Sequence, residues 1–241
     1  MIKQKRAQVT IFIILGLVLL LSMGIFIYYT STAEETISIP EEIDQATLTA
    51  YVQSCLDATT EESIQKVAAN GGMNKPIFYK TVGGKNISYW CTGEGEEQCV
   101  NTAFLKEDLA EQIVEGVKQE LPKCLDFHSF EQQGYTIQEG IFEGSAILTE
   151  TGIDLTITYP IKMKKEDEEA TVENFRVVQE TTLGTLYDIA VQIVNTEATG
   201  TSFDIVSYIT NHTNLIITKQ RPYPSIIYSI KAKKNDLTLN I

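Results

Sequence analysis

Polar and apolar residues follow different periods in different parts of the chain, and these periods predict its elements. Residues 9–29 form a run of apolar and small side chains, and no charged residue occurs between positions 7 and 33. A helix of that length spans about 31 Å, which matches the hydrocarbon thickness of a bilayer. The run is therefore predicted to be a transmembrane helix.

Two later segments have the spacing of amphipathic helices. The first lies between residues 40 and 70 and stops at Gly71 and Gly72, which favour the end of a helix. In the second, apolar residues recur every four positions and Pro122 ends the pattern. The apolar residues of this second stripe are Leu105, Leu109, Ile113, Val117 and Leu121. Both segments are predicted to pack on a core through their apolar faces.

Strand patterns dominate the rest of the chain. Residues 76–80 and 85–91 flank a glycine-containing turn and predict a hairpin. Residues 135–138, 141–149 and 153–161 alternate apolar and polar side chains, which is typical of an antiparallel sheet with one buried face. Residues 215–218 and 225–231 also have strand character.

One further long helix is predicted over residues 171–194. Phe175, Val178, Leu186, Ile189 and Ile193 lie on one helical stripe of this segment. A helix of this kind can cover one face of the preceding sheet.

The predicted fold class is α+β, with an N-terminal transmembrane helix followed by an extracellular domain of antiparallel sheet packed with amphipathic helices. The expected order along the chain is a short basic cytoplasmic leader (1–8), the transmembrane helix (9–29), a stalk (30–39), a disulfide-stapled lobe of helices and a hairpin (40–126), and a lobe of antiparallel sheet and long helix (127–241).

Charge predicts the orientation of the chain and excludes some partners. Lys3, Lys5 and Arg6 precede the apolar run, and acidic residues follow it, so the N-terminus is expected in the cytoplasm and the remainder outside. The outer part then has 16 basic residues against 32 acidic ones. Nucleic acid is therefore not expected as a partner, because phosphate binding needs a basic surface.

Four cysteines are expected to form two disulfides, because an even number in an exported domain favours pairing. Cys91 and Cys99 enclose a short loop that contains glycine, which predicts one bond and leaves Cys55 with Cys124. A zinc site is the rival interpretation, but CxxC spacing is absent and the chain has only two histidines. No metal or other cofactor is predicted.

Two sequence motifs predict N-glycosylation of an exported chain, at Asn86 and at Asn211. No motif predicts catalysis. The chain lacks HExxH, a phosphate-binding loop, a dinucleotide fingerprint and a nucleophile elbow. No catalytic residue is therefore assigned.

The residues KRAQVTIFII at 5–14 resemble the start of archaeal type IV pilin-like precursors. In that family a short basic segment and a small residue precede a glutamine, and an apolar helix follows at once. The resemblance implies cleavage by a prepilin peptidase between Ala7 and Gln8. Two other N-termini are open: a secretory cut after Ala33, or an uncut chain that begins at Met1.

These features together predict a pilin-like structural or adhesion protein of the cell surface, anchored or assembled through its N-terminal apolar helix. Expected partners are membrane lipid, copies of the same chain in a filament, and other envelope proteins. The alternative is a single-pass ectodomain that binds a ligand or an envelope partner without forming a polymer.

Overall fold

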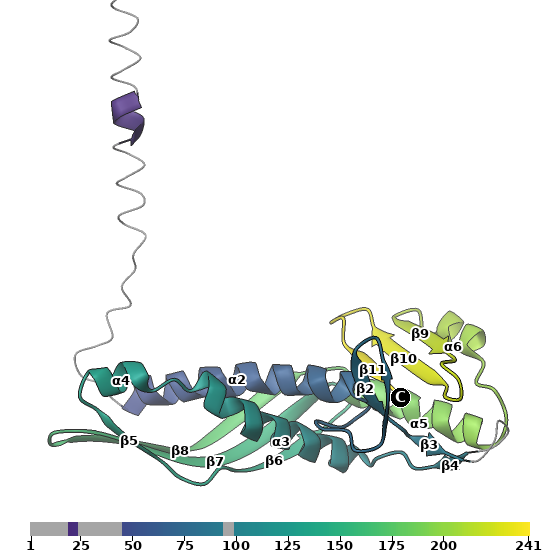
Figure 1. Ribbon diagram of the computed structural model, residues 1–241, viewed down its shortest axis with the longest axis horizontal. Coiled ribbons are helices and arrows are strands. Elements are labelled where there is room, and N and C mark those ends of the chain that lie inside the picture. Colours follow the sequence, from purple (N-terminus) through teal and green to yellow (C-terminus); the bar gives the residue numbers. More distant parts are fainter. Residues whose placement is uncertain (1–18, 24–44, 94–98) are drawn as a thin grey trace, which may run out of the picture. The chain divides into compact units, whose positions relative to one another are not determined.

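The structure, a computed structural model, describes residues 19–23, 45–93 and 99–241. Asp44–Ile241 form one compact unit (Figure 1). Its helices are α2 (Gln45–Ala69), α3 (Lys106–Cys124), α4 (His128–Gln132), α5 (Leu183–Ala198) and α6 (Ile205–Asn211). Its strands are β1 (Tyr79–Val82), β2 (Lys85–Ser88), β3 (Cys91–Thr92), β4 (Val100–Asn101), β5 (Thr136–Glu139), β6 (Glu143–Leu148), β7 (Gly152–Lys165), β8 (Glu168–Glu180), β9 (Leu215–Gln220), β10 (Ile227–Ala232) and β11 (Thr238–Asn240).

The transmembrane part of the predicted fold class is corrected by the structure. Across residues 19–23, 45–93 and 99–241, no helix combines the length and the apolar character needed to cross a bilayer. Of the predicted span 9–29, only residues 19–23 are described. The fold is α+β with several sheets. The predicted leader and stalk lie outside the described residues.

Strand β7 is the centre of the largest sheet. It pairs with β8 along one edge, and along the other edge it pairs first with β6 and then with β5, all antiparallel. The alternating residues of β7 are buried on one face: Ile153, Leu155, Ile157, Tyr159, Ile161 and Met163. The alternation over 153–161 therefore predicted this strand and its buried face correctly.

A β-bulge lets this long strand contain a proline. Between Thr158 and Ile161 the register shifts, so that Tyr159 and Pro160 oppose the single residue Glu173 of β8. A bulge leaves one residue unpaired, which suits a proline without an N–H group. On the other edge the N–H of Gly140 donates to the Pro160 carbonyl at 2.7 Å, at the point where β5 ends.

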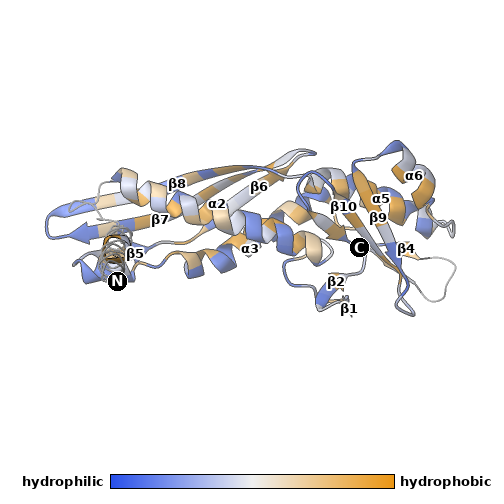
Figure 2. Ribbon diagram, turned by 90° about the horizontal axis from the view of Figure 1, so that it is seen from above, coloured by the Kyte–Doolittle hydropathy of each residue, from blue (hydrophilic) through white to orange (hydrophobic). Residues whose placement is uncertain are grey.

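Helices α2 and α3 cover the buried face of this sheet, α2 against β8 and α3 against β6 (Figures 1 and 2). The buried face of α2 has helical spacing and includes Leu48, Val52, Cys55, Leu56, Ile64 and Val67. Helices α2 and α3, from the predicted lobe 40–126, thus pack against strands of the predicted lobe 127–241, and both belong to one compact unit.

The helix predicted over residues 171–194 is wrong in its first half. Residues 168–180 form strand β8, and only Leu183–Ala198 are helical. Val178, placed on the buried stripe by the helical interpretation, is 69% exposed, whereas Val172, Phe175 and Val177 are buried. Opposite the bulge, Glu173 and Asn174 are both exposed, so the buried positions change from even to odd and imitate helical spacing.

A second sheet, in the order β11-β10-β9, contacts α5 through β10 and β11 and α6 through β9. Strands β9 and β10 correspond to the predicted runs at 215–218 and 225–231. The Asn240 side chain of β11 donates to the Ala69 carbonyl at the end of α2, at 2.8 Å. This contact joins the second sheet to the helix that covers the first.

Candidate functional site

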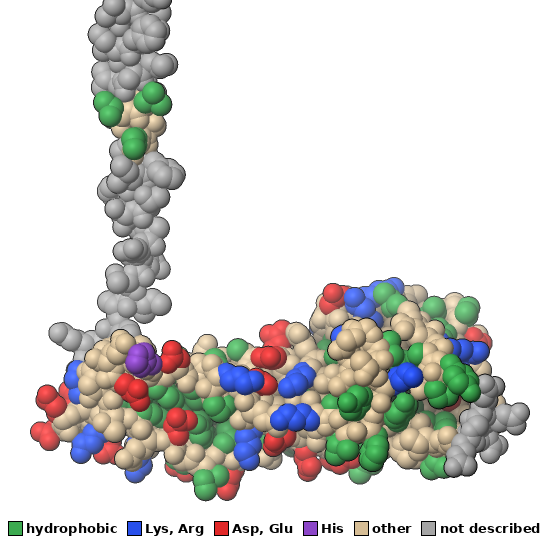
Figure 3. All heavy atoms as spheres, viewed as in Figure 1, with side chains coloured by type: hydrophobic (Ala, Val, Ile, Leu, Met, Phe, Trp, Pro, Cys, Tyr) green, Lys and Arg blue, Asp and Glu red, His purple; other side chains and the backbone are tan. Residues whose placement is uncertain are grey.

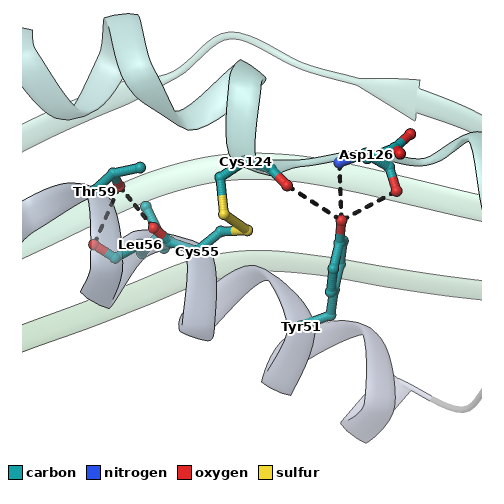
Figure 4. Close-up of a disulfide and its surroundings, with 6 residues drawn as sticks. All are labelled: Tyr51, Cys55, Leu56, Thr59, Cys124 and Asp126. Carbon is teal, nitrogen blue, oxygen red and sulfur yellow. Dashed lines mark hydrogen bonds between the residues drawn. A yellow bond between two sulfur atoms is a disulfide. The ribbon is translucent and has the colours of Figure 1, made fainter. Parts of the chain in front are cut away.

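The predicted disulfides are both formed. Cys55 of α2 is bonded to Cys124 of α3, and Cys91 is bonded to Cys99. Beside the first bond, the Tyr51 hydroxyl accepts a hydrogen bond from the Asp126 N–H at 2.8 Å and lies 3.1 Å from the Asp126 carbonyl oxygen (Figure 4). Burial, together with the nearby Asp126 charge, raises the pKa of Tyr51. The two bonds indicate an extracellular or otherwise oxidising environment.

The predicted hairpin is also present, with strands at Tyr79–Val82 and Lys85–Ser88, and it lines one side of a pocket. Val82 pairs with Lys85, so the turn consists of Gly83 and Gly84, both with positive φ. Such a turn favours glycine because other residues are strained there. Strands β1 and β2 are thereby folded back over the segment that follows α2.

The pocket between these two segments has a volume of about 380 Å³, and we call it the hairpin pocket. Its polar lining residues are Asn70, Asn74 and Lys75 from the segment after α2, and Tyr79, Lys85 and Asn86 from the hairpin. Its lining contains no carboxylate. Its charged lining residues are Lys75 and Lys85, and Lys85 also borders a second pocket that is lined by Glu61, Glu180 and Asp236.

Asn74 is the most unusual residue of the hairpin pocket. It is only 2% exposed, and neither its amide nitrogen nor its amide oxygen has a hydrogen-bond partner. Only its backbone N–H is paired, with the side-chain oxygen of Gln112 at 3.0 Å. A buried polar group without a partner costs about 1–3 kcal/mol, so a residue of this kind needs an explanation.

The two lysines of the pocket are available for a ligand. Among the described residues, neither Lys75 nor Lys85 forms an ion pair, although other lysines do so with Glu120, Asp188, Glu197 and Asp236. Asn86 is oriented by Thr81, whose hydroxyl donates to the Asn86 amide oxygen at 2.8 Å. This leaves the Asn86 amide nitrogen as a donor.

An apolar surface adjoins the pocket. Ile77 and Phe78 at the start of the hairpin are 74% and 80% exposed, and Tyr223 of the loop between β9 and β10 is 84% exposed. The ammonium group of Lys80 donates to the Tyr223 carbonyl at 3.3 Å, which brings the two segments together. We call Ile77, Phe78 and Tyr223 the hairpin surface; Figure 3 shows hydrophobic side chains around the hairpin, whereas acidic side chains are spread along the molecule.

A second polar cluster, around Glu197, is structural. Its Oε1 atom accepts hydrogen bonds from the Phe203 N–H at 2.9 Å, from Lys219 at 3.0 Å and from the Tyr228 hydroxyl. Burial opposes ionisation of Glu197, but these hydrogen bonds and the Lys219 charge hold its pKa below the usual value. Burial and the Glu197 carboxylate raise the pKa of Tyr228. Because its members satisfy one another, this cluster fixes the end of α5 to β9 and β10.

The two glycosylation motifs lie in different surroundings. Asn211 and Thr213 are exposed at the end of α6. Asn86 is half-buried in β2, and Ser88 of the same motif is 2% exposed, with its hydroxyl oxygen buried and unpartnered. The surface placement implied by the motif therefore holds for Asn211 and fails for Ser88.

Two other features considered in the sequence are the leader cleavage site and a metal site. Ala7 and Gln8, the expected cleavage site, lie outside the described residues. Within the described ranges no group of three or more His, Cys, Asp or Glu side chains could hold a metal ion. Trp90 is a packed core residue: it is 2% exposed, and its indole N–H donates to the Gly71 carbonyl at 2.7 Å.

Sequence analysis predicted the hairpin but missed its pocket. The residues that line it are separated by up to 16 positions and are ordinary asparagines and lysines without a motif. The only signal in the sequence was a glycine-rich turn beside lysines in an otherwise acidic chain. Comparisons of the chain with protein-family models, with curated proteins and with solved structures found no match.

Proposed function

We propose that the protein is a structural or adhesion protein of the cell surface, of a pilin-like kind. The observation that supports this most is the hairpin surface, an exposed aromatic and apolar area on a domain stapled by two disulfides. Exposed apolar areas of this kind mark sites of interaction on other molecules, because contact removes them from water. The disulfides belong to an oxidising environment, which agrees with a position outside the cytoplasm.

Labelling of intact cells tests the location. A membrane-impermeant amine reagent should modify exposed lysines of the domain, such as Lys75 and Lys118, before the cells are broken. Modification of these lysines only after lysis would contradict the proposed location. The first residue of the mature protein tests the pilin-like part, which requires a start at Gln8.

Adhesion is tested by variants of the hairpin surface. Phe78→Ser and Tyr223→Ser together should reduce attachment of cells to surfaces. Ile141→Ser is the matched control, because Ile141 is 78% exposed and lies between β5 and β6, away from the hairpin in sequence and sheet. Equal attachment by all variants would exclude an adhesive role for the hairpin surface.

A second function, favoured by the hairpin pocket, is binding of a ligand by an ectodomain that does not polymerise. The two functions differ in assembly. Filaments visible by electron microscopy on producing cells support the pilin-like function, whereas a uniformly monomeric protein that retains ligand binding supports the second.

A further inference from the structure

We propose that the hairpin pocket binds a carboxylate-bearing sugar unit of an acidic polysaccharide. This inference rests on the proposed adhesive function and names the chemical class of its target.

The size of the pocket suits a small ligand or one unit of a larger one. Its volume of about 380 Å³ is near the lower end of the ~300–1,000 Å³ range of ligand pockets. It is open to one side between the hairpin and the segment after α2. A chain of sugars can therefore place one unit inside while its neighbours extend along the surface.

The charges of the pocket favour a single carboxylate. Lys75 and Lys85 are exposed ammonium groups without an ion pair among the described residues, and the lining offers no acid to neutralise them. A carboxylate between them gains charge-assisted hydrogen bonds. A long nucleic acid would instead meet the acidic remainder of the domain, which repels a polyanion of closely spaced phosphates.

The amides of the pocket suit sugar hydroxyl groups. A carboxamide both donates and accepts hydrogen bonds, and so does a hydroxyl group. The Asn86 amide nitrogen is a donor positioned by the bond from Thr81. The Asn74 carboxamide is not part of this set, because both of its polar atoms are buried and its Cγ atom lies 3.7 Å from where a Cβ at Gly116 of α3 would be.

Tyr79 provides the apolar part of the site. It lines the pocket and is 44% exposed, so its ring offers a face to a ligand. The C–H groups of a pyranose ring form an apolar face of comparable width, and contact between the two faces removes both from water. Carboxylate, hydroxyl groups and one apolar face are together the features of a uronic acid.

Calorimetric titration of the purified full-length protein tests this assignment. The ligands are trigalacturonic acid and its methyl ester, which differ only in the charge of the carboxyl groups, with inorganic phosphate as a separate anion. We expect saturable binding of the acid, at least tenfold weaker binding of the ester, and no displacement of the acid by equimolar phosphate. Equal binding of acid and ester, or phosphate binding as tight as that of the acid, would overturn the proposal.

Variants place the binding in the pocket. Lys75→Gln together with Lys85→Gln should weaken binding of the acid at least tenfold, and Tyr79→Ala should weaken binding of acid and ester alike. Lys118→Gln, an exposed lysine of α3 without an ion pair among the described residues, is the control and should leave binding unchanged. Unchanged binding in the double lysine variant would also overturn the proposal. Labelling of intact cells tests the proposed location independently of these titrations. Failure of the sugar assignment would therefore not contradict the proposed location.

Discussion

Gly184 lies directly against the backbone of Thr149: a Cβ atom at position 184 would be 2.0 Å from the Thr149 carbonyl oxygen. Gly184 is in the first turn of α5, and Thr149 precedes the turn between β6 and β7. Two further contacts hold the same junction, from the Thr185 hydroxyl to the Glu150 carbonyl at 2.8 Å and from the Thr181 N–H to the Thr151 carbonyl at 3.1 Å. The position of α5 on the sheet therefore depends on the absence of a side chain at residue 184.

Gly184→Ala should lower the free energy of unfolding by about 3 kcal/mol, because the helix must move away from a backbone that cannot yield. The loss exceeds the small gain in helix propensity that alanine brings, about 1 kcal/mol. Urea unfolding followed by circular dichroism measures the change. Gln192→Ala, on the exposed side of the same helix, serves as the control and should stay within about 0.5 kcal/mol of the natural chain.

The regular elements of this fold were predictable where one period held throughout. Leu109, Ile113, Val117 and Leu121 keep helical spacing and are all buried in α3. The ends of this helix were predicted less well: Leu105, the first residue of the predicted stripe, is the N-cap and is 63% exposed, and the helix continues past Pro122 to Cys124. Strand β8 was not predictable in this way, because the bulge at Pro160 shifts its buried positions from Val172 to Phe175. A period is counted along one strand at a time, whereas this shift is caused by the pairing of β8 with the neighbouring strand β7.

The cysteine pairing was predictable because loop length constrains it, whereas the hairpin pocket was not. Cys91 and Cys99 are eight residues apart, and their bond follows from proximity in the sequence. The hairpin pocket depends on where Gly83 and Gly84 direct β2, and on the burial of Asn74 beside α3. Tertiary packing decides both, and neither leaves a periodic signal in the sequence.

The two disulfides should contribute unequally to stability. The Cys55–Cys124 bond spans 69 residues and the Cys91–Cys99 bond spans 8. Chain-entropy estimates for loops of these lengths are about 4 kcal/mol and about 2.5 kcal/mol. Replacing Cys55 and Cys124 by serine should therefore lower the urea midpoint more than replacing Cys91 and Cys99. The reverse order would show that unfolded-state entropy does not dominate here.

Acid should weaken the contacts around Glu197. The pKa of this carboxyl is lower in the folded chain than the ordinary value of 4.5, so its contribution to stability is present above pH 4.5. That contribution is lost as the pH falls through the folded pKa. In urea titrations at several pH values, the natural chain should be more stable than Glu197→Gln at pH 7, and the difference should shrink below pH 4.5. Glu168→Gln, at an exposed position, controls for the removal of one negative charge; a difference that stays constant with pH would contradict the role of Glu197.

Glycosylation should occur at Asn211 and not at Asn86 when the folded protein meets the transferase. The Asn211 motif is exposed, whereas Ser88 of the other motif is buried in β2. Mass spectrometry of peptides from the secreted or surface-exposed protein measures occupancy at each site. Thr213→Ala should abolish the modification at Asn211. A glycan at Asn86 would mean that the chain is modified before β2 forms, and it would also cover the hairpin pocket.

Asn74 should be a residue at which an apolar side chain makes the chain more stable. Its carboxamide is buried without a partner, so Asn74→Leu, which is similar in size, should raise the free energy of unfolding by about 1 kcal/mol. The same substitution should leave binding of trigalacturonic acid unchanged, because both polar atoms of the carboxamide are buried beside Gly116 and out of contact with the pocket opening.

Ser88→Ala tests the same cost at a second buried position. The Ser88 hydroxyl is also buried and unpartnered, but Ser88 does not line the hairpin pocket. Its substitution should raise stability to a similar degree and leave sugar binding unchanged, as measured by urea unfolding and calorimetric titration of the same samples. If neither Asn74→Leu nor Ser88→Ala stabilises the chain, these unpaired polar groups do not lower its stability. Loss of sugar binding in Asn74→Leu alone would show instead that the ligand rearranges the chain until it contacts this carboxamide.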